Sequence, residues 1–328
     1  MQARPLLFDV CPSRARHAEA GVAVWAGDGC AGRAPGVKIS VVIPAYNAAH
    51  FLPRCLASVF SQTLQPEEVI VVDDGSTDDT AAVATRLGAR VVCRSNGGLS
   101  AARNTGVRSS AGDWVALLDA DDLWAPEKLR SQAERVHSQT VLVYTGIRIF
   151  DDEGVRQTYL ATDPVCARKM LRYRNPITPS SVIARRDALC EDGGFREDIR
   201  ACEDWEMWVR LQRMGKFEAV REALTDYYVY PASMSADPKR MLDALEQIID
   251  TTLVADLKGA GRWMWSRRIR AVQLYSAALI ARDNGLKGET GYMLQSLAGW
   301  PSPFWEPRRF AGLAVSMRNQ FRRGKRVK

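Results

Sequence analysis

Three carboxylates lie within four positions of the segment LLDADDLW, residues 117–124. Asp119, Asp121 and Asp122 directly follow an apolar run, and carboxylates packed this closely repel one another. A strand that runs into an acidic turn would explain the pattern without any function. A divalent hard cation would also explain it, because such a cation takes oxygen ligands and converts the repulsion into binding.

Two further acidic segments carry residue types that could bind a nucleotide or do chemistry. Asp73 and Asp74 open the segment DDGSTDD, where an aspartate could accept the imide N–H of a uracil. Glu203 and Asp204 open the segment EDWEMWVRL, whose apolar residues recur at helical spacing, so both acids fall in the first turn of a predicted helix. Acids are also common in a first turn for electrostatic reasons alone.

The elements that must position these residues alternate along the chain. Strands followed by helices indicate right-handed crossovers and a mostly parallel sheet flanked by helices, an α/β fold. Further strands are predicted at 141–150 and 177–184, and helical spacing dominates from about 239 onward. In the first part of the chain, β-branched runs predict strands and apolar spacing predicts helices, in the order strand 38–43, helix 51–60, strand 68–73, helix 79–87, strand 89–93, helix 99–110 and strand 113–119.

The most polar sequences of this part come after the predicted strands. Ligands of a parallel sheet bind beyond the carboxyl ends of its strands. The segments PAYN, DDGSTDD, RSNGG and DADD each come directly after one of the four strands. We therefore expect the carboxylates to meet at one edge of the sheet, where a uracil-binding aspartate and an Asp-x-Asp pair would form a site for a nucleoside diphosphate.

Composition narrows the class of protein. The 328 residues are 46% apolar and 25% charged, which is ordinary for a globular protein. Seven cysteines without a CxxC pair indicate a reducing cytoplasm, and no uncharged apolar run reaches the roughly 18 residues of a membrane-spanning helix. Residues 1–36 are aperiodic and lack a signal sequence, so they are expected to be a disordered extension or the product of a start codon placed too far upstream.

The net charge of +7 is unevenly distributed. Residues 261–328 carry 14 Lys and Arg against 3 Asp and Glu, a local charge of +11, so the first 260 residues sum to −4. The basic character therefore belongs to the C-terminal region, which argues against nucleic-acid binding by the body of the protein. The segment 290–305 is rich in Trp and Phe and lies between basic clusters, so we expect a peripheral membrane contact there, with a solvated basic end as the equal alternative.

Two enzyme classes are disfavoured by the segment directly after the first strand. PAYNAA is not a glycine-rich dinucleotide loop, and the chain has no GxxxxGK[ST] phosphate loop. These absences argue against a dehydrogenase and against a P-loop enzyme.

Six motifs in order resemble the family 2 glycosyltransferases, enzymes of the GT-A fold. They cover about residues 38–235 and read SVVIPAYNAA, VIVVDDGSTDDT, NGGLSAARNTG, LLDADDLWAPEKL, GGFRED and CEDWEMWVRL. The resemblance implies an inverting transfer of a sugar from a nucleotide-diphosphate sugar, in the first place a UDP-sugar, to a hydroxyl of a glycan or lipid-linked acceptor. It also implies a place in cell-envelope or exopolysaccharide synthesis.

The resemblance implies roles for the residues of the donor site. Pro44, Tyr46 and Asn47 match the segment that walls the nucleoside. Asp73 and Asp74 jointly match the uracil-binding position, because the sequence does not say which carboxylate turns inward. In the third motif, Asn96 forms the turn and Arg103 lies near the nucleotide and the acids, with an exposed helical arginine as the alternative.

The resemblance also assigns the metal and the base. Asp119 and Asp121 would hold Mn²⁺ or Mg²⁺ on the diphosphate, with Asp121 the favoured ligand, and Asp122 would cap a helix that begins in LWAPEKL. Asp204 is the expected general base, with Glu203 the next candidate. The N-terminus of the predicted helix would favour the ionised carboxylate that a base needs.

The sequence departs from the family pattern at two positions, and two rival functions remain. Val229 stands where the family has an arginine, and Arg196 where it has an acid, which puts a diphosphate contact and the acceptor loop in doubt. The rivals are a nucleotidyltransferase, which needs a glycine-rich loop after the first strand, and a non-catalytic sugar-nucleotide or glycan-binding module. The sequence does not specify the donor sugar, the acceptor, the linkage or the oligomeric state.

The predicted regions are the extension 1–36, a transferase domain 37–238 with halves 37–125 and 126–238, and a helical basic region 239–328.

Overall fold

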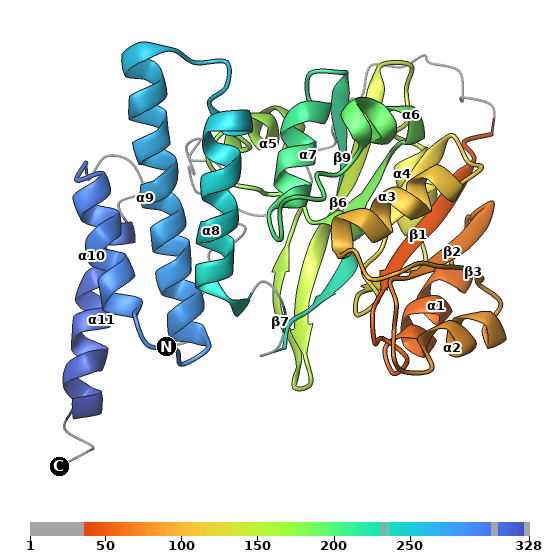
Figure 1. Cartoon of the computed structure of the whole chain (residues 1–328), viewed down its shortest axis with the longest axis horizontal. Helices are drawn as coiled ribbons and strands as arrows, with labels where there is room; N and C mark the ends of the chain where they lie inside the picture. The colour runs from red at the N-terminus through yellow and green to blue at the C-terminus, as the bar shows by residue number, and fades with distance from the viewer. Residues whose placement is uncertain (1–35, 231–232, 234–235, 303–307, 325–328) are drawn as a thin grey trace, which may run out of the picture.

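The computed structural model describes residues 36–230, 233, 236–302 and 308–324. The described chain forms one nine-stranded sheet with helices on both faces, followed by a group of helices beside the sheet (Figure 1). This is the α/β class expected from the alternating pattern. The predicted extension 1–36 lies almost entirely outside the described residues, and the limits of the predicted regions stay predictions.

The first half of the sheet is parallel, as the sequence predicted. Its strands are ordered β3-β2-β1-β4, and each neighbouring pair runs parallel. The predicted strands and helices are all present within about two residues of their expected bounds. They are β1 (Ile39–Ala45), α1 (Leu52–Phe60), β2 (Glu68–Asp73), α2 (Thr80–Arg86), β3 (Arg90–Cys93), α3 (Leu99–Ser109) and β4 (Trp114–Leu117).

The second half of the sheet is mixed. Next to β4 the order continues β8-β6-β9-β5, and β7 pairs with the outer part of β6. β8 is antiparallel to both β4 and β6, whereas β6 and β9 run parallel. These strands are β5 (Leu123–Trp124), β6 (Thr140–Asp151), β7 (Gly154–Tyr159), β8 (Val182–Arg185) and β9 (Lys216–Tyr228).

Alternation along the strands divides the core between the two faces of the sheet. In β1, Val42 belongs to one buried cluster and its neighbours Val41 and Ile43 belong to the other. This is the period of two expected of a strand that is buried on both faces. The Val42 face is covered by α3 and α7 (Glu203–Leu211), and the opposite face by α1 and α4 (Lys128–Ala133); α5 (Pro164–Met170) and α6 (Arg186–Cys190) complete the body.

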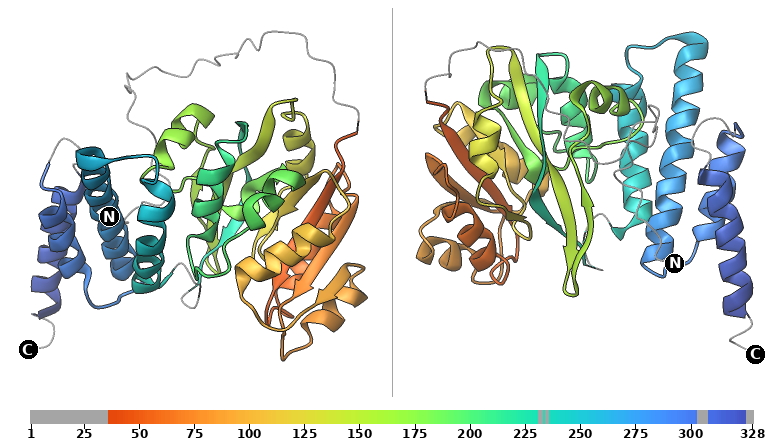
Figure 2. Two further views of the ribbon diagram at one scale, coloured as in Figure 1. Left: turned by 45° about the horizontal axis from the view of Figure 1, so that its top comes forward. Right: turned by 180° about the vertical axis from the view of Figure 1, so that it is seen from behind.

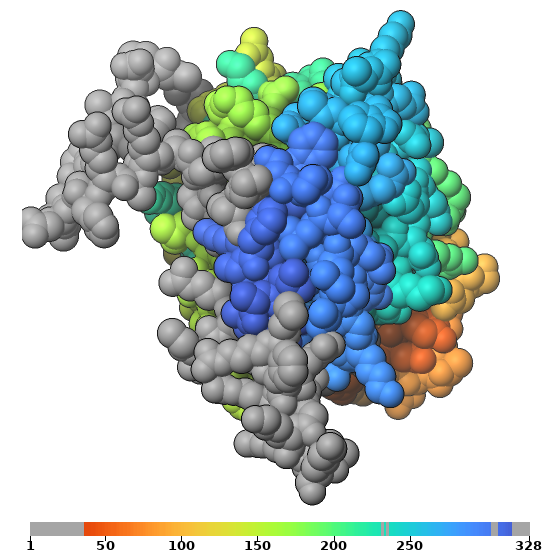
Figure 3. Space-filling view, turned by 90° about the vertical axis from the view of Figure 1, so that its left-hand side faces the viewer, coloured from red at the N-terminus to blue at the C-terminus, as the bar shows by residue number. Residues whose placement is uncertain are grey.

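The C-terminal helices stack side by side and lead away from the sheet (Figures 1 and 2). α8 (Pro238–Ile248) packs on the sheet domain through Ala244 and Leu245, and α9 (Gly259–Asp283) packs on α8. α10 (Glu289–Gly299) and α11 (Arg308–Gly324) come next, and with α9 they form the face shown in Figure 3. Among the described residues, none of these helices combines the length and the apolar content needed to span a membrane.

Two local predictions were wrong. LWAPEKL was expected to begin a helix, but Leu123–Trp124 form β5, which pairs with Asp226 and Thr225 of β9, and α4 begins only at Lys128. The expected strand 177–184 is shorter, because Pro179–Ser181 form a 3₁₀ turn and only 182–185 are extended. The first error arises because Leu123–Trp124 pair with β9, which the sequence analysis did not predict. The second arises at Pro179, where the chain makes a turn before β8 pairs with β4 and β6.

Candidate active site

Two adjoining cavities of about 400 Å³ each lie at the carboxyl ends of the parallel strands. Pro44, Tyr46 and Glu203 line both. We call them the Asp74 cavity and the Asp204 cavity, after the carboxylates that distinguish them. The Asp74 cavity also contains Asn96, and the Asp204 cavity contains Asn47, Asp119 and Asp121. The loops after β1, β2, β3 and β4 therefore meet at one edge of the sheet, as predicted.

Asn47 joins the loops that come after β1 and β2. Its backbone has φ of 49°, a left-handed conformation that asparagine tolerates better than most residues. The Asn47 Oδ1 accepts hydrogen bonds from the backbone N–H of Thr77 at 2.8 Å and from its hydroxyl at 3.2 Å, and the Asn47 N–H donates to Ser76 Oγ at 3.0 Å. These bonds hold the neighbouring Tyr46 ring, 52% exposed, at the mouth of both cavities.

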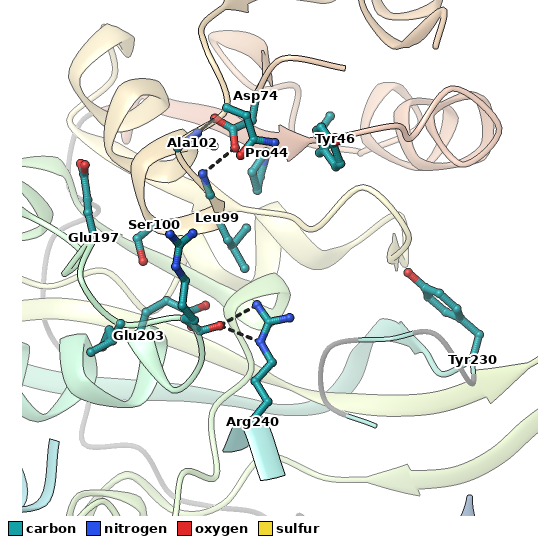
Figure 4. Close-up of a pocket in the computed structure, with 16 residues that line it drawn as sticks. Pro44, Tyr46, Asp74, Leu99, Ser100, Ala102, Glu197, Glu203, Tyr230 and Arg240 are labelled. Atoms are coloured by element: carbon teal, nitrogen blue, oxygen red, sulfur yellow. Dashed lines mark hydrogen bonds between the residues drawn. The ribbon is translucent and has the colours of Figure 1, made fainter. Parts of the chain in front are cut away.

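The structure separates the roles of Asp73 and Asp74. The Asp73 carboxylate accepts the N–H of Ser76 at 2.9 Å and so closes its own turn. Asp74 lines the cavity and accepts hydrogen bonds from Arg94 Nη1 at 2.9 Å and from the N–H groups of Gly97 and Gly98 at 3.0 and 2.7 Å. Figure 4 shows Asp74 and Pro44 on one side of this cavity, with Glu203 and Arg240 opposite.

Arg103 is a buried cation that connects α3, β4 and α7. Only 1% of its side chain is exposed, so the alternative of an exposed helical arginine is wrong. Its Nη2 donates to Asp119 Oδ1 at 2.7 Å, and its Nη1 donates to Glu203 Oε1 at 2.6 Å. Burial lowers the pKa of Arg103, but Asp119 and Glu203 raise it further than burial lowers it, so the guanidinium stays charged.

The Asp-x-Asp segment places two carboxylates beside each other in the Asp204 cavity. Burial and then the charge of Asp119 raise the pKa of Asp121 to about 6, while a hydrogen bond with Tyr230 works in the opposite direction. Among the described residues, no group of three or more His, Cys, Asp or Glu side chains is arranged to hold a metal ion. Two carboxylates that repel each other in a cavity fit a hard cation whose remaining ligands come from phosphate and water.

Asp122 does not cap a helix, contrary to the prediction. Its carboxylate is buried and accepts the backbone N–H of Tyr228 at 2.9 Å. This bond ties the acidic loop to the end of β9. The physical reason is the presence of β5, which places Asp122 against β9 rather than at the start of α4.

Asp204 lies in the first turn of α7, as predicted, but its electrostatics differ from the prediction. The helix N-terminus was expected to favour the ionised form, whereas burial and then Glu203 raise the pKa of Asp204 to about 7. Asn175 Nδ2 donates to Asp204 Oδ2 at 2.9 Å, and the N–H of Trp205 donates to Oδ1 at 2.7 Å. A carboxyl with a pKa near neutrality is well matched to proton transfer at neutral pH.

Two tryptophans of α7 hold this arrangement in place. The indole N–H of Trp205 donates to the carbonyl of Leu171 at 2.7 Å, and that of Trp208 donates to the carbonyl of Ile177 at 3.1 Å. The two carbonyls flank the short segment that supplies Asn175. The apolar stripe of α7 therefore fixes Asp204 and its hydrogen-bond partner Asn175 in one unit.

Several lining residues were not predicted as part of the site. Asn175 precedes Pro176 and has only the sequence signature of an ordinary turn, whereas Tyr230 stands two positions after Tyr228, at the end of β9. α8 and α9 contribute Met241, Gln273 and Ser276, which no local pattern connects with a site.

The two departures from the family pattern lie outside both cavities. Arg196 forms an ion pair with Asp198 on the surface, and the N–H of Val229 donates to the carbonyl of Phe150 at 2.9 Å. Neither side chain lines a cavity. Of the serines after Val229, Ser233 lines the Asp204 cavity and Ser235 lies outside the described residues.

The fold defines a structural class, the GT-A type. Solved structures of this type share the fold. S. aureus TarS 1–349 in complex with UDP-GlcNAc matches with a TM-score of 0.57 and 22% identity, over 79% of each chain. The mannosyltransferase PcManGT from Pyrobaculum calidifontis, in complex with GDP-Man and Mn²⁺, matches with a TM-score of 0.55 and 19% identity, over 85% of this chain and 86% of that one.

Sequence comparison identifies the family. The model of glycosyl transferase family 2 matches residues 40–188. The UDP-Glc:alpha-D-GlcNAc-diphosphoundecaprenol beta-1,3-glucosyltransferase WfaP of Escherichia coli is 29% identical over 206 residues, which cover 61% of this chain and 80% of that protein. Residues 40–188 of the chain therefore belong to glycosyltransferase family 2.

Proposed function

We propose that the protein is an inverting, metal-dependent glycosyltransferase that moves a sugar from a UDP-sugar to a hydroxyl of a glycan or lipid-linked acceptor. The observation that carries the proposal is the arrangement of three carboxylates. Asp121 and Asp204 line one cavity, and Asp74 lines the cavity that adjoins it. Asp74 could bind the nucleoside, Asp121 could bind the diphosphate through a metal ion, and Asp204 could activate the nucleophile.

The Asp74 cavity is the proposed nucleoside site. A carboxylate oxygen carries two lone-pair sites, so Asp74 can accept the uracil N–H in addition to its internal hydrogen bonds. Pro44 and Tyr46 offer flat surfaces to the base, and Asn96 lies beside it. The UDP-GlcNAc bound by TarS supports a uridine nucleotide as the first one to test.

Asp119 and Asp121 are the proposed metal ligands. A divalent cation bound to them would stabilise the negative charge that develops on the departing diphosphate. Arg103 holds one oxygen of Asp119 and so orients the pair toward the cavity. The chemistry of two adjacent carboxylates suits Mn²⁺ or Mg²⁺ equally.

Asp204 is the proposed general base. It would take the proton from an acceptor hydroxyl, which then attacks the anomeric carbon from the side opposite the diphosphate and inverts its configuration. Glu203 is less suited to this role, because its carboxylate is ion-paired with Arg103. Asn175 donates to one oxygen of Asp204 and orients the carboxylate while leaving lone pairs for the incoming proton.

Release of nucleoside diphosphate from a panel of UDP- and GDP-sugars tests the function. With Mn²⁺ we expect release that stops when EDTA is added and that speeds up when a sugar acceptor is supplied. A nucleotidyltransferase would release pyrophosphate from a nucleoside triphosphate, and a binding module would bind UDP with Mn²⁺ without turnover. Either of these results contradicts the proposal.

The proposed acceptor is suggested by the name of a relative, and the proposed location by the positive charge of the C-terminal residues. WfaP is named for a diphosphoundecaprenol-linked acceptor, and a lipid-linked acceptor would suit an enzyme that contacts the inner face of the plasma membrane from the cytoplasm. The basic C-terminal residues supply the charge for such a contact. Such a reaction belongs to cell-envelope or exopolysaccharide synthesis.

A further inference from the structure

A wall of aromatic rings forms one side of the Asp204 cavity. Phe51, Tyr228 and Tyr230 line the cavity and contact one another. The centroids of Tyr228 and Tyr230 are 5.4 Å apart with the rings stacked, and Phe51 lies 5.7 Å from Tyr230 and 6.0 Å from Tyr228. All three side chains are only partly buried, so each keeps part of its surface accessible.

A second layer of side chains, Arg54 and Phe150, contacts these rings from outside the cavity. The Arg54 guanidinium lies 4.6 Å from the Tyr228 centroid, 5.7 Å from Phe51 and 5.6 Å from Phe150, and Phe150 is 5.0 Å from Tyr228. Neither Arg54 nor Phe150 lines the cavity. Arg54 is exposed, and its guanidinium makes cation–π contacts with the rings.

The chemistry of the wall indicates what it would bind. A pyranose ring has a face of C–H bonds, which packs on the electron-rich face of an aromatic ring, and a rim of hydroxyls, which need hydrogen-bond acceptors. The same cavity supplies both, because the carboxylates of Asp121 and Asp204 lie in it. A nucleobase has its own place in the adjoining cavity around Asp74.

The position of the wall favours the acceptor over the donor sugar. Tyr230 forms a hydrogen bond with Asp121, where the diphosphate is proposed to lie. From Tyr230 the wall continues through Phe51 and Tyr228 toward the surface. The Tyr228 hydroxyl reaches Asp152, in the exposed turn between β6 and β7. A donor sugar is confined between the metal and the base, whereas an acceptor continues into solvent.

We propose that Phe51, Tyr228 and Tyr230 form a stacking platform for a pyranose ring of the acceptor. The acceptor would then be a saccharide or a lipid-linked saccharide rather than a peptide or a nucleotide. This inference rests on the proposed glycosyltransferase function and narrows its substrate class.

Phe51→Leu tests the platform, because leucine keeps the apolar volume but has no aromatic face. Phe150→Leu is the matched control, since it makes the same change in the second layer. Acceptor KM would be measured with methyl β-glycosides of glucose, galactose and N-acetylglucosamine. We expect Phe51→Leu to raise KM roughly three- to tenfold, Phe51→Trp to restore it, and Phe150→Leu to change it less than twofold.

A second readout detects the stacking directly. In the presence of UDP and Mg²⁺, the ring C–H protons of a bound methyl glycoside should shift upfield in the NMR spectrum of the parent protein, and this shift should be lost in Phe51→Leu. Equal KM values for the Phe51 and Phe150 leucine variants would overturn the platform, as would the absence of binding of every glycoside by the parent. Failure of the parent to release nucleoside diphosphate from any nucleotide sugar would instead contradict the proposed function.

Discussion

Asp204 is the residue whose chemistry depends most on its surroundings. The first turn of a helix favours an ionised carboxylate, but burial in the cavity and the neighbouring Glu203 outweigh that preference and bring the pKa to about 7. The charge of Arg103 lowers the pKa of Asp204, but by less than burial and Glu203 raise it. The result is a carboxyl that can both lose and accept a proton near neutral pH.

Asp204→Asn should lower turnover by roughly 10²- to 10⁴-fold, with donor affinity within a few-fold of the parent, because only the proton acceptor is lost. In the parent, kcat/KM should fall as the pH drops through about 7, since the base becomes protonated below that value. Initial rates across pH, with UDP affinity measured by titration calorimetry, check both points. Activity that persists in the asparagine variant would place the base elsewhere, with Glu203 the first candidate.

The same variant has a predicted effect on stability. The carboxyl ionises at about 3.8 in an unfolded chain and at about 7 in the folded protein, so its ionisation opposes folding increasingly as the pH rises between these values. Above pH 7, Asp204→Asn should therefore have a higher Tm than the parent, and the difference should shrink toward pH 4. An unchanged difference across this range would contradict the raised pKa.

Asp121→Ala should abolish the metal-dependent part of UDP binding and nearly all turnover while leaving the fold intact. The physical reason is that the diphosphate and the cation depend on each other for binding. Calorimetry of UDP with and without Mn²⁺ measures this dependence. Asp79→Ala, an exposed aspartate in the loop after β2, is the control and should bind as the parent does. If Asp121→Ala binds UDP–Mn²⁺ as tightly as Asp79→Ala, the metal assignment is wrong.

At the scale of elements, Arg103 joins three parts of the chain that form independently. It starts in α3, reaches Asp119 after β4 and reaches Glu203 at the start of α7, so one guanidinium sets the separation of the proposed metal site and the proposed base. The tryptophans of α7 set the other side, by holding the carbonyls that flank Asn175.

Arg103→Met should destabilise the protein by on the order of 3 kcal/mol, because removal of one partner leaves a buried carboxylate uncompensated. Urea unfolding measures the change in the free energy of unfolding. Adding Glu203→Gln to this variant should recover part of the loss, since it removes the unpaired charge. A single variant as stable as the parent would show that the ion pairs contribute little to the fold.

At the scale of the whole molecule, the C-terminal helices take part in the site as well as in the fold. α8 and α9 complete the wall of the Asp204 cavity through Met241, Gln273 and Ser276. The basic residues at the end of the sequence follow these helices along the chain. The proposed acceptor site and the proposed membrane contact therefore both involve the C-terminal region.

The basic end should bind anionic vesicles at low ionic strength, because each Lys or Arg near such a surface contributes about 1 kcal/mol. Flotation with phosphatidylglycerol-containing vesicles, compared with neutral vesicles, measures this. Replacement of Arg322, Arg323, Lys325, Arg326 and Lys328 by glutamine should abolish flotation without changing turnover of a water-soluble acceptor. If the parent stays unbound at low salt, the basic end is only a solvated surface.

The class of the fold and the edge of the sheet that carries the candidate site could both be predicted from local sequence patterns. Strand and helix periodicity are local, and the ends of parallel strands must meet at one edge, so the four polar loops could be placed together without a structure. The motifs after β2 and β4 and at the start of α7 then indicated a nucleotide-sugar site.

The arrangement of the carboxylates, by contrast, depends on long-range packing. Asp74 rather than Asp73 faces the cavity because the N–H groups of Gly97 and Gly98 turn it inward, and Glu203 is ion-paired with Arg103, 100 residues earlier in the chain. The contact of Asn175 with Asp204 and the pKa near 7 likewise arise from burial and long-range packing. Such effects depend on which segments fold against one another, and no local pattern of residue types specifies that.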